Sequence, residues 1–136
     1  MSENNTSEQI ARLTIKEWAE EDRPREKFLE KGETALTNAE LIAILFRSGV
    51  RGKTALDIAR ELVQKNTLEK LAKMSASELK NLPIGMLKNG KVQVLGIARG
   101  MTLAAAFSLI RRVRFETSVT EKKKFLTPQH VFELFH

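Results

Sequence analysis

The sequence predicts an all-α protein, a small bundle of about six helices, from three observations. Apolar residues make up 42% of the 136 residues but aromatic residues only 6%, so the core is expected to consist mainly of Leu, Ile, Val and Ala. Of these, Leu and Ala favour helix. Proline and glycine, which interrupt helices, occur only three and seven times. Pairs of residues that start helices also recur along the chain.

The first helix is expected after a polar lead-in. Residues 1–12 are polar and are predicted to be disordered. Asp22-Arg23-Pro24 then starts a helix, because proline is favoured in a first turn. Gly32 is expected to end this helix.

The next helix carries the clearest start signal. Thr37 and Glu40 form a capping box, in which each side chain accepts a hydrogen bond from the other residue's backbone. Gly49 is expected to end the helix. Its buried stripe is predicted to comprise Leu41, Ile44 and Leu45.

Three further helices are expected before residue 83. One is predicted over residues 53–65, with Leu56, Ala59, Leu62 and Val63 on one face. A short helix starts at Asn66, and another starts with the capping box of Ser75 and Glu78. Pro83 ends the last of them, because proline disfavours helix in the residue before it.

Residues 85–95 leave two structures open. Lys88-Asn89-Gly90 is a turn signal, whereas the run from Val92 to Leu95 fits either a strand or one helical turn. From Ala98 or Met101 to about Phe115 the pattern is helical again. The inward side chains of this helix are predicted to be Leu103, Ala106, Phe107, Ile110 and Val113.

The end of the chain differs in character. Residues 116–125 are mostly polar and contain a run of three lysines, and we interpret them as a basic linker. Thr127 and Pro128 start a short element over residues 126–136, whose apolar side chains still lack a partner where the sequence ends. We therefore expect a helical domain over residues 13–115 and the truncated start of a second domain.

The net positive charge comes entirely from the last part of the chain. The formal net charge is +6, yet residues 1–84 hold 14 basic and 14 acidic residues, and residues 85–136 hold 9 basic and 3 acidic residues. This asymmetry indicates an anionic partner for the later part. A solvated basic face without a partner is the alternative.

Several function classes are disfavoured by residues that are missing. The sequence has no cysteine and only two histidines, His130 and His136, and no catalytic or metal-binding constellation is recognisable. We therefore expect no enzymatic activity, metal or cofactor in this chain. No apolar run is long enough for a membrane span and no leader is recognisable, so we expect a cytoplasmic protein that does not bind membranes.

A glycine-rich stretch before the last long helix suggests a phosphate-binding turn. Glycine lets backbone N–H groups approach phosphate oxygens, and the positive end of the following helix points at the same place. The candidate DNA-backbone ligands are Gly85, Lys88, Lys91, Gly96, Arg99 and Gly100. The alternative is that these glycines only allow close helix packing.

Two further groups of basic residues are secondary candidates. Arg51 and Lys53 lie in a glycine-containing loop that lacks the spacing of a nucleotide-binding P-loop. Arg111 and Arg112 are expected at the end of a helix, where the helix dipole favours cations without any ligand.

The chain resembles the N-terminal region of the RadC family of bacterial proteins. The resemblance rests on residues 15–27, 36–45 (LTNAELIAIL), 48–53 (SGVRGK), 57–62 (DIAREL), 104–107 and 111–112. It implies a helical domain with a helix-hairpin-helix motif and a connection with DNA repair. It also implies a zinc-dependent, metallopeptidase-like C-terminal domain, whose His-x-His ligands are absent from this chain.

The family hairpin differs in one respect here. Its usual Gly-x-Gly turn is replaced by Gly96-Ile97-Ala98-Arg99-Gly100, so either two residues are lost or residues 86–95 are inserted after Gly85. We expect weak, sequence-independent DNA binding through this degenerate motif. The alternative is a helical interaction domain that positions the protein's own C-terminal domain and does not bind DNA.

Overall fold

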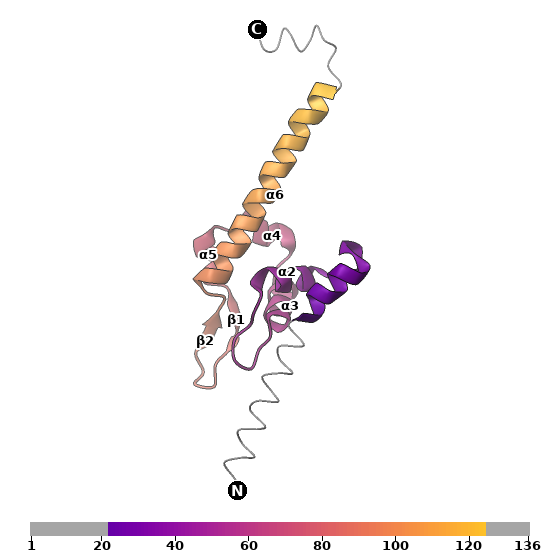
Figure 1. Cartoon of the computed structure of the whole chain (residues 1–136). Helices are drawn as coiled ribbons and strands as arrows, with labels where there is room; N and C mark the ends of the chain where they lie inside the picture. The colour runs from indigo at the N-terminus through magenta and orange to yellow at the C-terminus, as the bar shows by residue number, and fades with distance from the viewer. Residues whose placement is uncertain (1–21, 125–136) are drawn as a thin grey trace.

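The computed structural model describes residues 22–124, in which six α-helices and a two-stranded antiparallel sheet follow one another (Figure 1). The predicted helical fold is therefore confirmed, with a small sheet added. The elements are a helix at residues 22–31, the 3-10 turn η1 (Glu33–Ala35), α2 (Asn38–Phe46), α3 (Ala55–Lys65), α4 (Leu68–Lys73), α5 (Ala76–Lys80), β1 (Pro83–Met86), β2 (Val92–Val94) and α6 (Ile97–Lys124).

The predicted terminal segments lie outside this range. The lead-in at residues 1–12 and the second-domain element at residues 126–136 are not among the described residues. The first described helix ends as expected, because it extends to residue 31 and is followed by Gly32 with a φ of 82°, whereas its start lies at the limit of the described residues. None of the helices within residues 22–124 has both the length and the apolar composition that crossing a membrane requires.

The core is organised around α3. Its buried residues Ala55, Ile58, Ala59 and Leu62 recur at the spacing of one helix face. Ala59 and Leu62 were predicted, whereas Leu56 and Val63 are only partly buried. The same core cluster includes Leu71, Leu79, Ile84, Leu95 and Leu103 from the later elements.

The predicted buried face of α2 is wrong. Its core-facing residues are Ala39, Ile42, Ala43 and Phe46, whereas Leu41 and Leu45 are exposed. The helix is apolar on nearly every side, so periodicity alone could not identify the face that packs on α3. Leu41, Ile44 and Leu45 instead line an apolar groove of about 520 Å³ with residues of the preceding helix.

Hydroxyl side chains start four consecutive helices. The predicted capping boxes of Thr37 with Glu40 and of Ser75 with Glu78 are confirmed, and Thr54 forms a third with Asp57. The helix expected to start at Asn66 is instead capped by Thr67. Asn66 itself ends α3 by donating a side-chain hydrogen bond to the Leu62 carbonyl.

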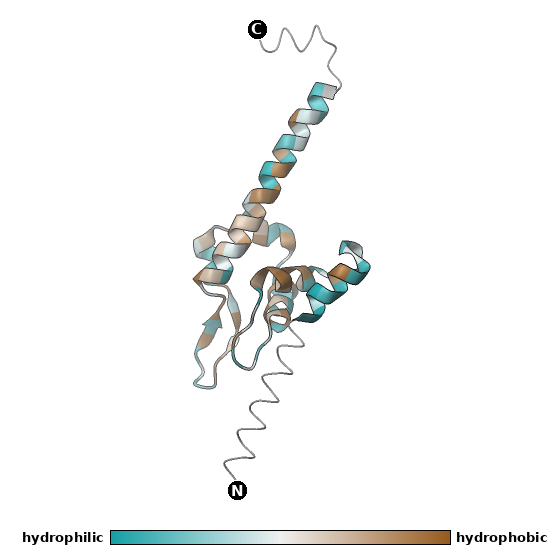
Figure 2. Ribbon diagram, in the orientation of Figure 1, coloured by the Kyte–Doolittle hydropathy of each residue, from teal (hydrophilic) through white to brown (hydrophobic). Residues whose placement is uncertain are grey.

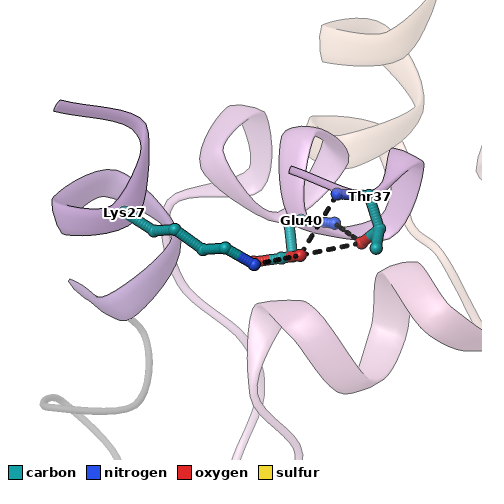
Figure 3. Close-up of polar contacts among 3 residues, drawn as sticks. All are labelled: Lys27, Thr37 and Glu40. Atoms are coloured by element: carbon teal, nitrogen blue, oxygen red, sulfur yellow. Dashed lines mark hydrogen bonds and ion pairs between the residues drawn. The ribbon is translucent and has the colours of Figure 1, made fainter. Parts of the chain in front are cut away.

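Glu40 joins its own helix to the helix at residues 22–31. Its carboxylate accepts hydrogen bonds from the Thr37 backbone N–H at 3.1 Å and from the Lys27 ammonium at 3.2 Å (Figure 3). Burial acts to raise the pKa of Glu40, but the hydrogen bonds from Thr37 and Lys27 and the charge of Lys27 together lower it below the ordinary value of 4.5.

The loop between α2 and α3 has a tight, specific backbone. Gly49 does not end α2 as predicted, because the helix ends at Phe46 and Arg47 follows with a φ of 67°. Gly49 is instead required by the turn, since a Cβ there would lie 2.0 Å from the Lys53 carbonyl oxygen. Val50 and Lys53 pair through two backbone hydrogen bonds of 2.9 and 3.0 Å.

Residues 83–94 form a β-hairpin, which decides between the two structures left open by the sequence. Pro83 pairs with Val94 and Met86 with Val92, with an irregularity between the two pairs. The predicted turn signal at Lys88-Asn89-Gly90 is confirmed, because Gly90 has a φ of 82° and donates to the Leu87 carbonyl. The hairpin extends from the body at the end opposite to the free end of α6 (Figure 1).

α6 is longer than predicted. It runs for 28 residues to Lys124 and therefore includes most of the segment interpreted as a linker, residues 116–125. Its first part packs on the core through Leu103, but every residue from Leu109 to Lys123 is exposed. Ile110 and Val113 are consequently not buried as predicted, because this half of the helix projects beyond the other described elements (Figure 2).

The Glu40 contacts predict a pH-dependent stability. Because the folded-state pKa is lowered, the stabilisation is present above about pH 4.5 and is lost as the pH falls through the lowered value. We expect Glu40→Gln to lower the free energy of unfolding at pH 7 by about 0.5–1 kcal/mol, measured by urea denaturation. The difference from wild type should vanish once the pH is well below the lowered pKa of Glu40, whereas Glu69→Gln, in an exposed pair, should have little effect at either pH.

The contact between α5 and α6 predicts an inverted effect of alanine. A Cβ on Gly100 would lie 2.8 Å from the Lys80 backbone nitrogen. Alanine normally stabilises a helix interior relative to glycine, but here we expect Gly100→Ala to lower the free energy of unfolding by about 1–3 kcal/mol through overpacking. An increase in melting temperature would contradict this close contact.

Candidate nucleic-acid interface

The predicted hairpin region brings α5 and α6 together at Gly100. This glycine is buried, and its Cα faces the backbone of Lys80 on α5. The chain between the two helices is the β-hairpin and not a short turn. Gly100 therefore has the packing role that was the alternative to phosphate contact.

Gly96 and Gly85 have backbone conformations that disfavour other residues. Gly96 has a φ of 89° and donates its N–H to the Lys80 carbonyl at 2.9 Å, while Leu95 donates to Leu82 at 2.8 Å. These bonds return the chain to the end of α5 just before α6 begins. Gly85, with a φ of 127°, leaves room for the Lys53 ammonium, which a Cβ would approach to 2.5 Å.

Lys53 is held within the fold. Its ammonium lies 2.7 Å from Glu61 Oε1 on α3 and also donates to the Ile84 carbonyl on β1. The α2–α3 loop is therefore attached to the β-hairpin through one side chain. Because Lys53 is already engaged with an acid, it is a poor candidate for a phosphate ligand.

Arg99 makes a second attachment of the same loop. Its guanidinium donates to the Ser48 carbonyl at 3.1 Å, which ties the first turn of α6 to the residues that follow α2. The Arg99 Nε atom is buried and makes no hydrogen bond with any other described residue. Its main role in this geometry is to hold the loop against α6.

Three of the candidate cations near the β-hairpin are available to a ligand. Arg51, Lys88 and Lys91 are exposed, and within residues 22–124 their side chains make no hydrogen bond or ion pair. Lys88 and Lys91 lie in the turn of the β-hairpin, and Arg51 lies in the α2–α3 loop. Both loops extend toward the same end of the molecule (Figure 1).

Arg111 and Arg112 do not lie at a helix end. Because α6 continues to Lys124, both lie in its middle, and the helix dipole no longer accounts for them. Arg111 donates to the Ala72 carbonyl at 2.9 Å and to Ser108 at 3.1 Å, which attaches α6 to α4. Arg112 is exposed, and about 20 Å of helix separates these arginines from the start of α6.

The charges of the hairpin and of the sequence around it are of one sign, although the Glu61 carboxylate of α3, paired with Lys53, lies beside Gly85. Residues 79–115, which include the hairpin and the first two thirds of α6, contain seven basic residues and no acidic residue. Such a surface attracts polyanions. The described residues contain no group of three or more His, Cys, Asp or Glu side chains placed to hold a metal ion.

One residue near the candidate interface was not expected from the sequence. Arg47 is exposed and has a positive φ of 67°, which is uncommon for a residue other than glycine. No local signal marks it, since the Gly49 that follows offered a more ordinary helix end. The hydrogen bond from Arg99 to the Ser48 carbonyl could not be predicted from the sequence either, because the two residues are 51 positions apart.

The comparisons with known proteins agree on one family. The model described as UPF0758 N-terminal matches residues 15–91. The UPF0758 protein of Trichlorobacter lovleyi is 36% identical over 126 residues, covering 90% of this chain and 50% of that protein. The UPF0758 protein of Chlorobaculum parvum is 37% identical over 113 residues, covering 83% of this chain and 46% of that protein.

The matches cover only part of the related proteins. The chain spans about half the length of the curated relatives it matches, such as the UPF0758 protein of Syntrophotalea carbinolica, of which it covers 50% at 38% identity. No solved structure matches this chain. The match to the family model ends at residue 91, in the turn of the β-hairpin.

The Lys53 contacts predict a structural role that can be separated from ligand binding. Lys53→Met keeps the aliphatic stem but leaves Glu61 without its partner, so we expect the free energy of unfolding to fall by about 1–3 kcal/mol. Lys73→Met is the matched control, because it breaks an exposed pair with Glu69 and should change stability by less than about 1 kcal/mol. Equal effects of both substitutions in urea denaturation would contradict the role of Lys53.

Proposed function

This chain belongs to the UPF0758 family, and from that premise we propose that its helical domain, residues 13–115, binds the DNA backbone without sequence preference and without enzymatic activity. The resemblance to the RadC N-terminal region is confirmed by this membership. The chain is therefore a RadC-type N-terminal domain, and the proposal concerns what this domain binds.

The observation that carries the proposal is the cluster of unpaired cations at one end of the molecule. Arg51, Lys88 and Lys91 project from two loops that Lys53 attaches to each other. Lys88 and Lys91 belong to a stretch of 37 residues, 79–115, that contains no acidic side chain. Lysine and arginine that contact phosphates release counterions, which favours binding to any DNA sequence.

The first turn of α6 can add to this binding. A helix of this length directs its free N–H groups and the positive end of its dipole toward the residues before Ile97. Gly96, with no atom within 4 Å of a potential Cβ, leaves the approach to this turn open. The altered hairpin thus retains one phosphate-binding feature even though Gly85 and Gly100 serve the fold.

A second function is favoured by the free half of α6. Leu109, Ile110, Val113 and Phe115 are exposed there, and α6 and α4 enclose a groove of about 540 Å³. Exposed apolar surface of this kind is typical of protein contacts. In this alternative the domain positions a zinc-dependent, metallopeptidase-like domain of the whole protein and does not bind DNA. The zinc, that domain and the cytoplasmic location stay predictions.

Neutralising the two hairpin lysines tests the DNA proposal. We expect Lys88→Gln with Lys91→Gln to weaken binding to all duplex sequences alike and to lower the salt slope of log K by about two. The measurement is fluorescence anisotropy with labelled duplexes at several salt concentrations.

A matched control removes the same charge elsewhere. Lys65→Gln with Lys70→Gln changes two exposed lysines at the end of α3 and on α4, and we expect the salt slope to stay near the wild-type value. If wild-type protein binds no duplex at low salt, or if both double variants bind equally, the proposal is wrong.

A further inference from the structure

The outward face of the β-hairpin is apolar and exposed. Met86 and Val92 are cross-strand partners, so their side chains lie on the same face, and they are 72% and 59% exposed. Val94, partner of Pro83, is also exposed. In contrast, Ile84 and Leu95 are fully buried in the core. The hairpin is therefore anchored by one set of residues and presents the other to solvent.

This apolar face adjoins the unpaired cations. Lys88 and Lys91 lie in the turn directly between Met86 and Val92, and the segment from Pro83 to Gly96 contains no acidic residue. A complementary partner must offer negative charge and apolar surface within a few ångströms. An intact duplex offers phosphates but hides its base faces in the stack, whereas an unstacked base step offers both.

We propose that Met86 and Val92 contact unstacked bases in distorted duplex DNA while Lys88 and Lys91 hold the neighbouring phosphates. This inference rests on the proposed DNA binding and names its preferred substrate. A two-stranded ribbon is narrow enough to enter a DNA groove, and apolar side chains such as Met that enter between base steps favour kinked DNA. The hairpin lacks the Trp and Tyr that characterise membrane interfaces.

The position of the hairpin in the chain supports a role in selecting the substrate. It lies between α5 and α6, where the family resemblance predicts a short phosphate-binding turn. A segment at this position reaches the same DNA that the start of α6 approaches. The bonds from Leu95 to Leu82 and from Gly96 to Lys80 fix its base, so the apolar face is held in place relative to α6.

The test compares two DNA probes and two double variants of the full chain. One probe is an intact duplex and the other is the same duplex with a one-nucleotide gap. We expect wild-type protein to bind the gapped duplex about tenfold more tightly, because the gap already unstacks the bases. Met86→Gln with Val92→Thr should abolish this preference and leave binding to the intact duplex within about twofold, since the lysines remain.

The control replaces equally exposed apolar residues elsewhere. Ile110→Gln with Val113→Thr acts on residues that are 51% and 59% exposed on the free half of α6, and it should keep the preference for the gap. Circular dichroism melting verifies that both double variants are folded. Loss of the preference in the control as well would overturn the assignment to the hairpin face.

The remaining outcomes separate this inference from the proposed function. Equal binding of wild-type protein to both probes, with the lysine effect intact, overturns the inference alone. Absence of binding to either probe overturns both. Loss of binding to phosphatidylglycerol vesicles on Met86→Gln with Val92→Thr, without any preference for the gap, overturns the inference in favour of a lipid surface.

Discussion

The close contact between α5 and α6 is the constraint on which the rest of the structure depends. Gly100 brings the two helices so near that no side chain fits between α6 and the Lys80 backbone. The chain must therefore leave α5 and return to it within a few ångströms, which the bonds from Leu95 and Gly96 accomplish. Residues 83–94 therefore project away from the two helices, and antiparallel pairing satisfies the hydrogen-bonding groups of their backbone. The projecting hairpin is thus a consequence of the helix contact at its base.

The sequence predicts those features that are encoded within a few residues. The capping boxes at Thr37 and Ser75 were predictable because their partners are three residues away. The buried face of α2 was not, because apolar residues surround the helix and only the position of α3 selects Ala39 and Ile42 over Leu41. The length of α6 was missed for a related reason. The described residues of its second half are exposed, so no buried periodicity marks them.

The candidate site shows the same limit in its charges. The sequence locates the excess of positive charge in residues 85–136, but it does not distinguish one basic side chain from another. The fold divides them, since Lys53, Arg99 and Arg111 bind acceptors within the chain, whereas Arg51, Lys88 and Lys91 have none among the described residues. Each of these three bound cations contacts a residue at least eight positions away in the sequence, so the neighbouring residues do not predict the contact. The cations best able to bind a polyanion are those without a partner within the fold.

The free half of α6 adds a purely mechanical property. Residues 112–124 extend the helix by about 20 Å beyond Arg111, which still binds α4, at 1.5 Å per residue. An uninterrupted helix of this length resists bending, so the separation between its far end and the hairpin is nearly constant. α6 is in this sense a spacer of fixed length that starts beside the Gly100 contact.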